Sequence, residues 1–292
     1  MSDYVLFVGC VIPMKYPSIE AAAINVFSKL GSRLETPPGF TCCPEPVMSR
    51  LIEEDFALAV SARNLAMAEA TGKDLIAVCS GCYETLHAAA ERLARDPEAL
   101  DRVKGMIGPL GKGFKANVKV RYYLDVLFED IGVPAIASKV TRKIGLRVAS
   151  HPGCHAIGGE AGGTTRPDML RAIVGTTGAE LVDYGLERLC CGWPMMQVDQ
   201  EAGINERLFV KLEAMKKAEV DAVLTTCPTC LMQFENGMAI LKRSGHDLQF
   251  PVFHVLEILS MCMGADPTAM GLELHRTKVK EMAMAKLGGG VK

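Results

Sequence analysis

The chain has 292 residues, 49% of them hydrophobic and 23% charged, and its 32 lysines and arginines against 34 acidic residues leave a net charge of −2. This composition predicts a soluble globular protein of two domains. It argues against disorder and against bulk electrostatic binding to nucleic acid or to an anionic membrane. No uncharged apolar run approaches the about 18 residues that a membrane span needs.

The first apolar segment covers residues 4–14. It follows Asp3 without a basic residue and contains Cys10 and Pro13, so we interpret it as mature structure and not as a signal sequence. We therefore expect a cytoplasmic protein.

The first half alternates between strands and helices. In chain order the pattern predicts a strand at 4–8, a helix at 18–30, a strand at 33–36, a helix at 53–70, a strand at 74–78 and a helix at 83–95. The first half must carry about 16 extra residues before its last helix near 124–127, and we place them in the polar, glycine-rich stretch 96–116.

The second half repeats this order. It predicts a strand at 147–150, a helix at 167–176, a strand at 179–184, helices at 203–217 and 231–242 around a strand at 222–226, and a strand near Pro251 before a last apolar helix. The leucine-rich run 124–127 resembles 256–259, 132 residues later.

This alternation predicts an α/β fold, with two similar domains whose short parallel sheets are flanked by helices. We expect these domains at 1–143 and 144–270, related by internal duplication about a pseudo-twofold axis. The basic segment 271–292, with Gly288, Gly289 and Gly290 near its end, is expected to be a frayed, solvated tail.

Ten of the eleven cysteines form an internal repeat. The first five follow C-x31-CC-x35-C-x2-C and the next five C-x35-CC-x35-C-x2-C, so four equivalent pairs are 148 residues apart and the first pair is 144 apart. The two sets are Cys10, Cys42, Cys43, Cys79 and Cys82, and Cys154, Cys190, Cys191, Cys227 and Cys230. Cys262 stands outside the repeat and is expected to be a buried free thiol.

The cysteines fall just beyond the carboxyl ends of predicted strands, where open α/β sheets place their sites. The adjacent pairs reach one small site only if the chain bends sharply there, because neighbouring side chains of an extended segment point to opposite sides. Pro44, Gly192 and Pro194 suit such bends.

Five thiolates per half exceed the four ligands of a structural zinc site or of an ordinary [4Fe–4S] cubane. Soft thiolates favour iron–sulfur, zinc or Cu(I) over hard cations, and the duplicated five-cysteine pattern favours iron–sulfur. Two zinc sites with spare thiols, or a disulfide framework, are the alternatives that the residues leave open.

The cysteine pattern resembles the tandem cysteine-rich (CCG) domain, and the chain is similar to the family of the heterodisulfide reductase B subunit over about 230 of 292 residues. Relatives in glycolate and lactate oxidising complexes often carry a separate C-x2-C-x2-C run, which is absent from this sequence. The adjacent cysteines Cys42 and Cys43 depart from the family pattern because Pro44 follows them, whereas Gly192 follows Cys190 and Cys191.

The resemblance implies that each five-cysteine set holds a noncubane [4Fe–4S] cluster. It implies a catalytic subunit that reduces the coenzyme M–coenzyme B disulfide to two thiols in methanogenesis. The implied partners are the flavin-containing A subunit together with the ferredoxin-like iron–sulfur C subunit of heterodisulfide reductase, with a hydrogenase or formate dehydrogenase upstream.

Disulfide cleavage takes two electrons, and the chain offers two equivalent sites. We expect the sites to face each other across a cleft with the S–S bond between them, each supplying about one electron. Thiol–disulfide exchange at the C-x2-C pairs is the rival mechanism. His151 and His155, beside Cys154, are candidate proton donors, with a role in orienting the loop as the alternative.

Two other functions stay open at this point. One is an iron–sulfur electron-transfer subunit of a glycolate- or lactate-type oxidoreductase, and the other is a metal-stabilised scaffold without catalysis. The anionic groups of the coenzymes would need cations, and Lys15, Arg50 and Arg166 lie near the ligand loops in sequence.

Overall fold

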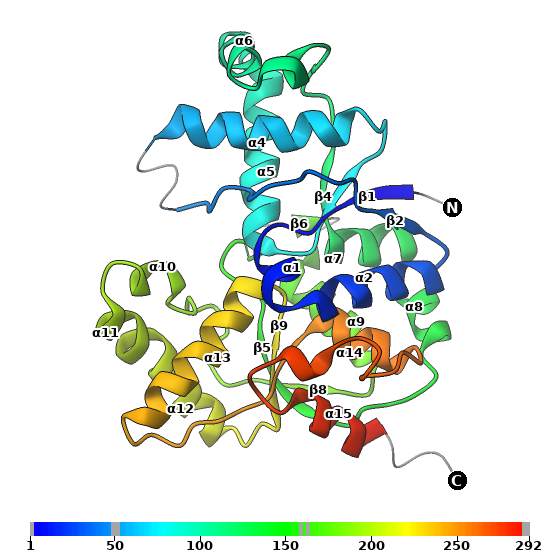
Figure 1. The fold of residues 1–292 in the computed structure, drawn as a ribbon. Coiled ribbons are helices and arrows are strands. Elements are labelled where there is room, and N and C mark those ends of the chain that lie inside the picture. The colour runs from blue at the N-terminus through cyan, green and yellow to red at the C-terminus, as the bar shows by residue number, and fades with distance from the viewer. Residues whose placement is uncertain (1–2, 48–52, 158–159, 162–163, 288–292) are drawn as a thin grey trace.

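The computed structural model describes residues 3–47, 53–157, 160–161 and 164–287 (Figure 1). Each half of the chain builds one four-stranded parallel sheet, and a two-stranded antiparallel hairpin, β6 (Glu160–Ala161) and β7 (Thr164–Thr165), lies in the second half. The predicted α/β class with two parallel sheets is confirmed.

The two sheets have equivalent strand orders, read from opposite edges. The first is β2-β1-β3-β4, formed by β1 (Asp3–Phe7), β2 (Arg33–Glu35), β3 (Leu75–Ala77) and β4 (Val120–Tyr122). The second is β10-β9-β5-β8, formed by β5 (Arg147–His151), β8 (Glu180–Val182), β9 (Ala222–Thr225) and β10 (Val252–His254). Strand β4, which leads directly into α7, is missing from the sequence prediction.

Helices flank both sheets, and one apolar core runs through both halves. The first half has α1 (Val11–Lys15), α2 (Pro17–Lys29), α4 (Glu54–Glu69), α5 (Ser80–Arg95), α6 (Pro97–Met106), α7 (Tyr123–Asp125), the π-helical η2 (Val126–Ile131) and α8 (Val133–Lys139). The second half has α9 (Arg166–Gly175), α10 (Trp193–Met196), α11 (Gln200–Ala202), the π-helical η3 (Gly203–Phe209), α12 (Val210–Lys217), α13 (Pro228–Arg243), α14 (Val255–Cys262) and α15 (Val279–Leu287).

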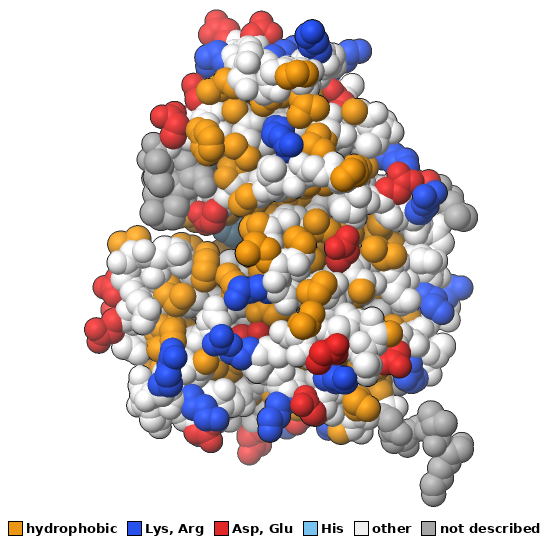
Figure 2. Space-filling view, in the orientation of Figure 1, with side chains coloured by type: hydrophobic (Ala, Val, Ile, Leu, Met, Phe, Trp, Pro, Cys, Tyr) orange, Lys and Arg blue, Asp and Glu red, His pale blue; other side chains and the backbone are white. Residues whose placement is uncertain are grey.

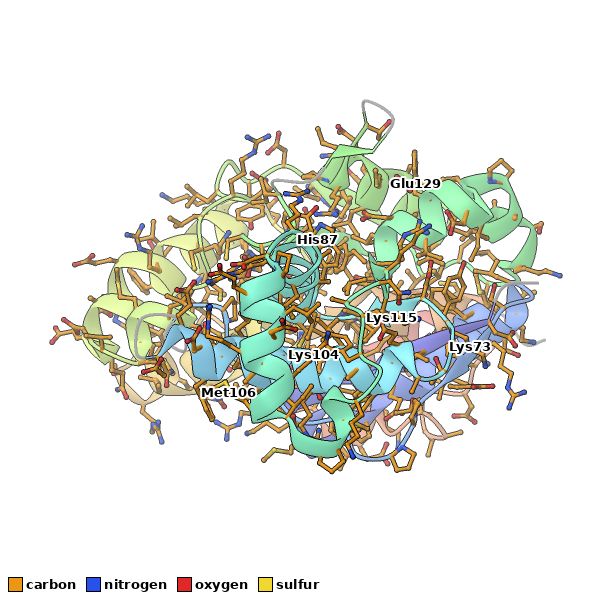
Figure 3. All side chains as sticks on the ribbon, turned by 90° about the horizontal axis from the view of Figure 1, so that it is seen from above. Lys73, His87, Lys104, Met106, Lys115 and Glu129 are labelled. Carbon is orange, nitrogen blue, oxygen red and sulfur yellow. The ribbon has the colours of Figure 1, made fainter. Side chains whose placement is uncertain are left out.

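The stretch 96–116, where the extra residues of the first half are expected, is largely helical. It contains α6 and the 3-10 turn η1 (Gly108–Gly111). Asp96 caps α6 by accepting a hydrogen bond from the Ala99 amide at 3.0 Å, and Pro97 fits the first helical position. Figure 3 looks down on this insertion, with Lys104 and Met106 labelled.

The last helix of each half packs on the other half. Helix α14 lies against α2, and α7 with η2 lies against α9 (Figure 1). Asp125 of α7 forms a two-point ion pair with Arg166 of α9, and Glu257, the equivalent of Asp125, accepts a hydrogen bond from Ser18 of α2 at 2.5 Å. The repeated leucine-rich run therefore carries an acidic anchor that joins the halves.

The segment expected to be a solvated tail is folded as far as Leu287. His275 is buried between the carboxylates of Glu235 and Glu257, and α15 buries Val279 and Ala283. A frayed terminus is thus wrong for 271–287, since burial of these side chains holds the segment, whereas Gly288–Gly290 lie outside the described residues. Within the described ranges, every helix is too short or too polar to cross a membrane.

Candidate metal centre

The predicted site residues lie at the carboxyl edges of both sheets. Cys10 follows β1, Cys79 follows β3, Cys154 follows β5 and Cys227 follows β9. Cys79 and Cys227 are the N-cap residues of the 16-residue helices α5 and α13, so these helices begin three residues earlier than predicted and include the second cysteine of each C-x2-C pair. The partial positive charge of a helix N-terminus favours thiolate there.

The first five thiols form one continuous group. Interactions between neighbouring thiols link Cys10 to Cys42, Cys42 to Cys43, Cys43 to Cys82 and Cys82 to Cys79. Both members of the adjacent pair, Cys42 and Cys43, belong to this group, so the chain makes the sharp bend that the sequence predicts there.

Helix α4 holds that bend. Asn64 donates from Nδ2 to the carbonyl of Cys42 at 3.0 Å, and Ser61 donates from Oγ to the carbonyl of Cys43 at 3.0 Å. Both side chains are buried, and neither was singled out from the sequence.

The second five thiols form the equivalent group, linked in the order Cys154, Cys190, Cys191, Cys230 and Cys227. Gly192 makes the bend here, with φ of +91° and its amide 3.5 Å from the sulfur of Cys190. A Cβ at Gly192 would lie 2.4 Å from the carbonyl oxygen of Gly203, so this turn requires glycine.

The two groups meet at one pair of sulfur atoms. Cys79 Sγ and Cys227 Sγ lie 3.5 Å apart, and both are buried. Because these residues occupy equivalent positions of the repeat, their mutual contact is what a pseudo-twofold axis between the halves produces. A Cβ on Gly153, beside Cys154, would lie 2.9 Å from Oγ of Ser80 on α5, so the two halves also approach closely here.

Contacts between thiols separate their pKa values. Interactions with Cys42 and Cys82 lower the pKa of Cys43, and interactions with Cys154 and Cys191 lower the pKa of Cys190. In both cases two neighbouring thiols favour the thiolate form. Thiolate is the form that binds metal.

His151 ends β5 inside the second group. It is 1% exposed, neither ring nitrogen has a hydrogen-bond partner among the described residues, and its ring stacks edge-on against Phe234. One ring nitrogen of His151 and the sulfurs of Cys191 and Cys230 lie within 4.8 Å of one another. Burial and the charge of Lys211 lower the pKa of His151 to about 3, so the ring is neutral, and a neutral imidazole suits a metal ligand or a hydrogen-bond donor better than a proton donor.

His155 lies on the loop that follows Cys154 and is half-buried. Its Nδ1 is 3.8 Å from a carboxylate oxygen of Glu84, which belongs to α5 of the first half. Of the two predicted histidines, His155 therefore has the access to solvent that proton transfer needs.

A cavity of about 180 Å³ opens over the first cysteine group. Its walls come from both halves, since Cys10, Cys42 and Pro46 face Trp193, Thr229 and Met232 across it. Figure 2 shows a recess in this region, between the upper part of the molecule and the part that carries α10. The lining from the second half was not identified from the sequence, because nothing in a single chain links Trp193 to the first cysteine group.

The three cations suggested from the sequence, Arg166, Arg50 and Lys15, have different outcomes in the structure. Arg166 is buried in its ion pair with Asp125 and lies over the ring of Tyr83, so its charge is already neutralised. Arg50 lies outside the described residues. Lys15 is exposed on α1, and Cys262 is fully buried outside both cysteine groups, as expected.

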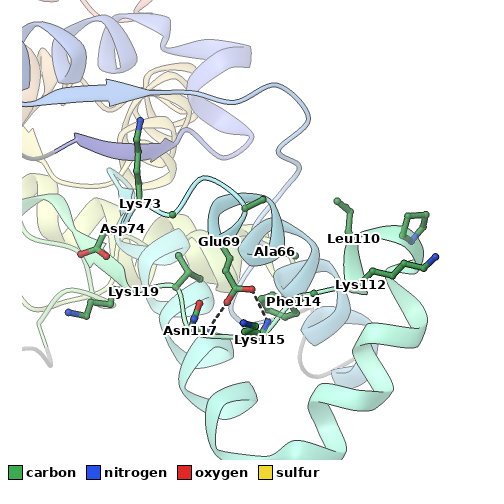
Figure 4. Close-up of a pocket in the computed structure, with 15 residues that line it drawn as sticks. Ala66, Glu69, Lys73, Asp74, Leu110, Lys112, Phe114, Lys115, Asn117 and Lys119 are labelled. Atoms are coloured by element: carbon green, nitrogen blue, oxygen red, sulfur yellow. Dashed lines mark hydrogen bonds between the residues drawn. The ribbon is translucent and has the colours of Figure 1, made fainter.

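A larger cavity, of about 650 Å³, lies elsewhere, between α4 and the segment that follows η1 (Figure 4). Glu69 occupies it and accepts hydrogen bonds from the amides of Lys115 and Asn117 at 2.8 and 2.7 Å. This carboxylate holds the loop. The described residues that line the cavity include no cysteine or histidine, so the cavity belongs to the inserted segment and not to the thiol centre.

The donor set fits iron–sulfur clusters. Ten thiols in two contiguous groups supply soft ligands in numbers that zinc does not need, and the unpartnered nitrogens of His151 leave the second group with a further donor. A disulfide framework does not fit, because the described structure has all eleven cysteines as free thiols.

Comparisons with known proteins agree with the duplication. The cysteine-rich domain (CCG) model matches twice, at residues 4–87 and 148–235. The B subunit of a ferredoxin/F420H2-dependent CoB–CoM heterodisulfide reductase from Methanosarcina acetivorans is 33% identical over 94% of this chain and 93% of its own length. Lactate utilization protein A from Geobacillus thermodenitrificans is 24% identical over 87% of this chain and 97% of its own.

The fold also has a solved counterpart. A hypothetical protein from Helicobacter pylori matches with a TM-score of 0.71 and 17% identity, over 95% of this chain and 52% of the other. This chain thus spans about half of that protein, and the likeness concerns the fold alone.

Proposed function

This chain belongs to the tandem cysteine-rich (CCG) domain family that includes the B subunit of heterodisulfide reductase, and we propose that it is the catalytic iron–sulfur subunit of such a reductase. The proposed reaction reduces the coenzyme M–coenzyme B disulfide to its two thiols during methanogenesis. The proposed assembly includes a ferredoxin-like C subunit together with a flavin-containing A subunit, with a hydrogenase or formate dehydrogenase upstream.

The observation that carries this proposal is the contact between the two thiol groups beside a cavity walled by both halves. Cys79 and Cys227 join the groups at 3.5 Å, and the cavity opens next to this contact. A disulfide held there would lie over the first group, beside the cysteine through which that group contacts the second. A single electron-relay site would have no need of such a junction.

The reaction balances with two electrons and two protons, because R–S–S–R′ takes up both to give RSH and R′SH. We assign one noncubane [4Fe–4S] cluster to each group of five cysteines. When bound, these clusters supply the two electrons and Lewis-acidic iron beside the developing thiolates. The cysteines hold the clusters.

The apolar walls of the cavity, including Trp193 and Met232, exclude water from the substrate sulfurs. His155 is the proposed donor of a proton to a departing thiolate, from its ring nitrogen on the half-exposed loop beside Cys154. His151, neutral and buried, is assigned to the second cluster as a ligand or as a hydrogen-bond donor to sulfur.

The second candidate is an electron-transfer subunit of a glycolate- or lactate-type oxidoreductase. The full-length similarity to a lactate utilization protein favours it. Both candidates use the same ten cysteines, so metal content does not separate them, whereas the substrate does.

Anaerobically purified protein is expected to contain about eight iron and about eight acid-labile sulfide per chain, four of each per cluster. Reduced with a viologen dye, it should release both thiols from the mixed coenzyme disulfide. Zinc in place of iron would contradict the proposed chemistry. Electron transfer to another acceptor without thiol release would favour the relay function.

Replacing His155 with glutamine is expected to lower the rate of thiol release by about 100-fold, the lower range for loss of a general acid. Iron content should be unchanged, because His155 lies outside the sulfur contacts. The matched control is His246→Gln, on the exposed loop between α13 and β10. Equal rates in the two variants would remove His155 from the reaction.

A further inference from the structure

Lys211 is a fully buried cation behind the second cysteine group. It projects from α12 and is 0% exposed. Its Nζ donates to the hydroxyl of Tyr184 at 2.9 Å, to the carbonyl of Leu186 and to the carbonyl of Glu187 at 3.5 Å. These three acceptors match the three donors of an ammonium group, which is how a protein retains a buried positive charge.

Hydrogen bonds place Lys211 against the backbone that carries the second cysteine group. Leu186 and Glu187, whose carbonyls accept from its Nζ, immediately precede the loop of Cys190 and Cys191. The hydroxyl of Tyr184 in turn donates to the carbonyl of Ser150, the residue before His151, at 3.0 Å. The sulfurs of Cys191 and Cys230 also lie within 4.8 Å of a ring nitrogen of His151.

The first half has different residues at the positions equivalent to Lys211 and His151. Arg63, 148 residues before Lys211, is partly exposed and donates to the carbonyl of Gly39 at 2.8 Å. Phe7, at the end of β1, occupies the place of His151 at the end of β5.

We propose that Lys211 raises the reduction potential of the second cluster above that of the first, so that the second cluster takes the first electron. An added electron is stabilised by a positive charge in a medium of low dielectric constant. Hydrogen bonds to cluster sulfurs and net charge are the factors through which proteins set such potentials, and His151 offers a ring N–H for the same purpose.

This inference rests on the proposed iron–sulfur function and deepens it. With both clusters bound, an external donor would supply two electrons one at a time, and the charge of Lys211 would favour the second cysteine group as the site of the first. No bond would form or break in these two transfers. The disulfide then takes up both electrons with two protons. The duplicated halves would thus differ in potential although they share one fold.

The test is a redox titration of the iron-loaded protein, followed by electron paramagnetic resonance. Lys211→Gln keeps hydrogen-bonding capacity and removes the charge, and Arg63→Gln is the matched control in the first half. Lys211→Gln should lower the reduced-to-oxidised ratio of the higher-potential cluster about tenfold at a fixed solution potential, which is about 59 mV for one electron. Arg63→Gln should leave that cluster unchanged, and Lys211→Arg should restore it.

Cys191→Ser assigns the signals independently of Lys211, since it should remove the higher-potential one. Loss of the lower-potential signal in Cys191→Ser would overturn the inference, and so would an unchanged potential in iron-loaded Lys211→Gln. A shift in Lys211→Arg as large as that in Lys211→Gln would also overturn it, because the charge is retained there. If the wild-type protein holds no iron, the proposed function itself fails, and iron analysis separates that outcome from the others.

Discussion

Replacing Cys191 with serine is expected to halve the iron content of the protein, from about eight to about four per chain, and to abolish thiol release from the mixed disulfide. Cys191 is 3% exposed and lies in the middle of the second group, in contact with Cys190 and Cys230. A serine hydroxyl is a poor replacement because iron–sulfur clusters select soft thiolate ligands.

The loss of activity should exceed the about 10- to 100-fold that removal of an outer-shell partner costs a metal site. In the proposed reaction each cluster supplies one of the two electrons, so a protein with one remaining cluster should lose nearly all thiol release. Iron analysis and an assay of free thiols measure the two effects in the same sample.

Cys262→Ser is the matched control, because Cys262 is a fully buried thiol outside both groups and donates to the carbonyl of Thr177 at 3.8 Å. This variant should keep its iron and its turnover. Full iron and normal turnover in Cys191→Ser would exclude a catalytic second site.

Replacing Glu257 with glutamine is expected to destabilise the protein by about 3–5 kcal/mol, the range for breaking one side of a buried ion pair. Glu257 is fully buried at the junction of α14, α2 and the C-terminal segment. It accepts from Ser18 and lies 2.9 Å from Nε2 of His275. Loss of its charge leaves the His275 imidazolium with Glu235 alone. Thermal unfolding at matched iron content measures the change.

The same network predicts how stability depends on pH. Burial opposes the charge of His275, but Glu257 and Glu235 outweigh it and raise the pKa of His275 to about 10, above its ordinary 6.5. This contribution is fully present below pH 6.5 and is lost as the pH rises through about 10. The pKa of Glu257 is lowered despite burial, by the charge of His275, so its contribution is present above its ordinary pKa of 4.5 and is lost as the pH falls below that value.

Glu257→Gln should therefore flatten the loss of stability on the alkaline side. The control is Glu273→Gln, since Glu273 is half-exposed and its ion pair with Lys280, at 3.7 Å, contributes less than about 1 kcal/mol. Equal unfolding temperatures in the two variants would show that the buried network does not hold the halves together.

The two halves keep the fold of the repeat but not its electrostatics. Asp125 and Glu257 serve as equivalent anchors, yet Asp125 binds an arginine whereas Glu257 binds a serine and a histidine. The equivalents Arg63 and Lys211 both hold the loop before the adjacent cysteines, but only Lys211 is buried. Duplication thus preserved backbone positions while the charges around the two sites diverged.

The sequence by itself determined the duplication, the parallel α/β class and the ten cysteines of the site. Strand and helix periods and the 148-residue repeat are local or periodic properties, so they can be read without knowing what lies across the molecule. The sequence did not determine the role of the inserted stretch, where Asp96 and Pro97 start a helix although glycines follow it. Nor did it show that the segment 271–287 folds.

Only the tertiary structure decided that Cys79 meets Cys227, that each last helix packs on the opposite half, and that Arg166 is neutralised by Asp125. The separation of two residues along a chain does not fix their separation in space once two halves pack against each other. The same holds for charge, because whether Lys211 acts as a solvated surface group or as a buried cation depends on which side chains remove it from water.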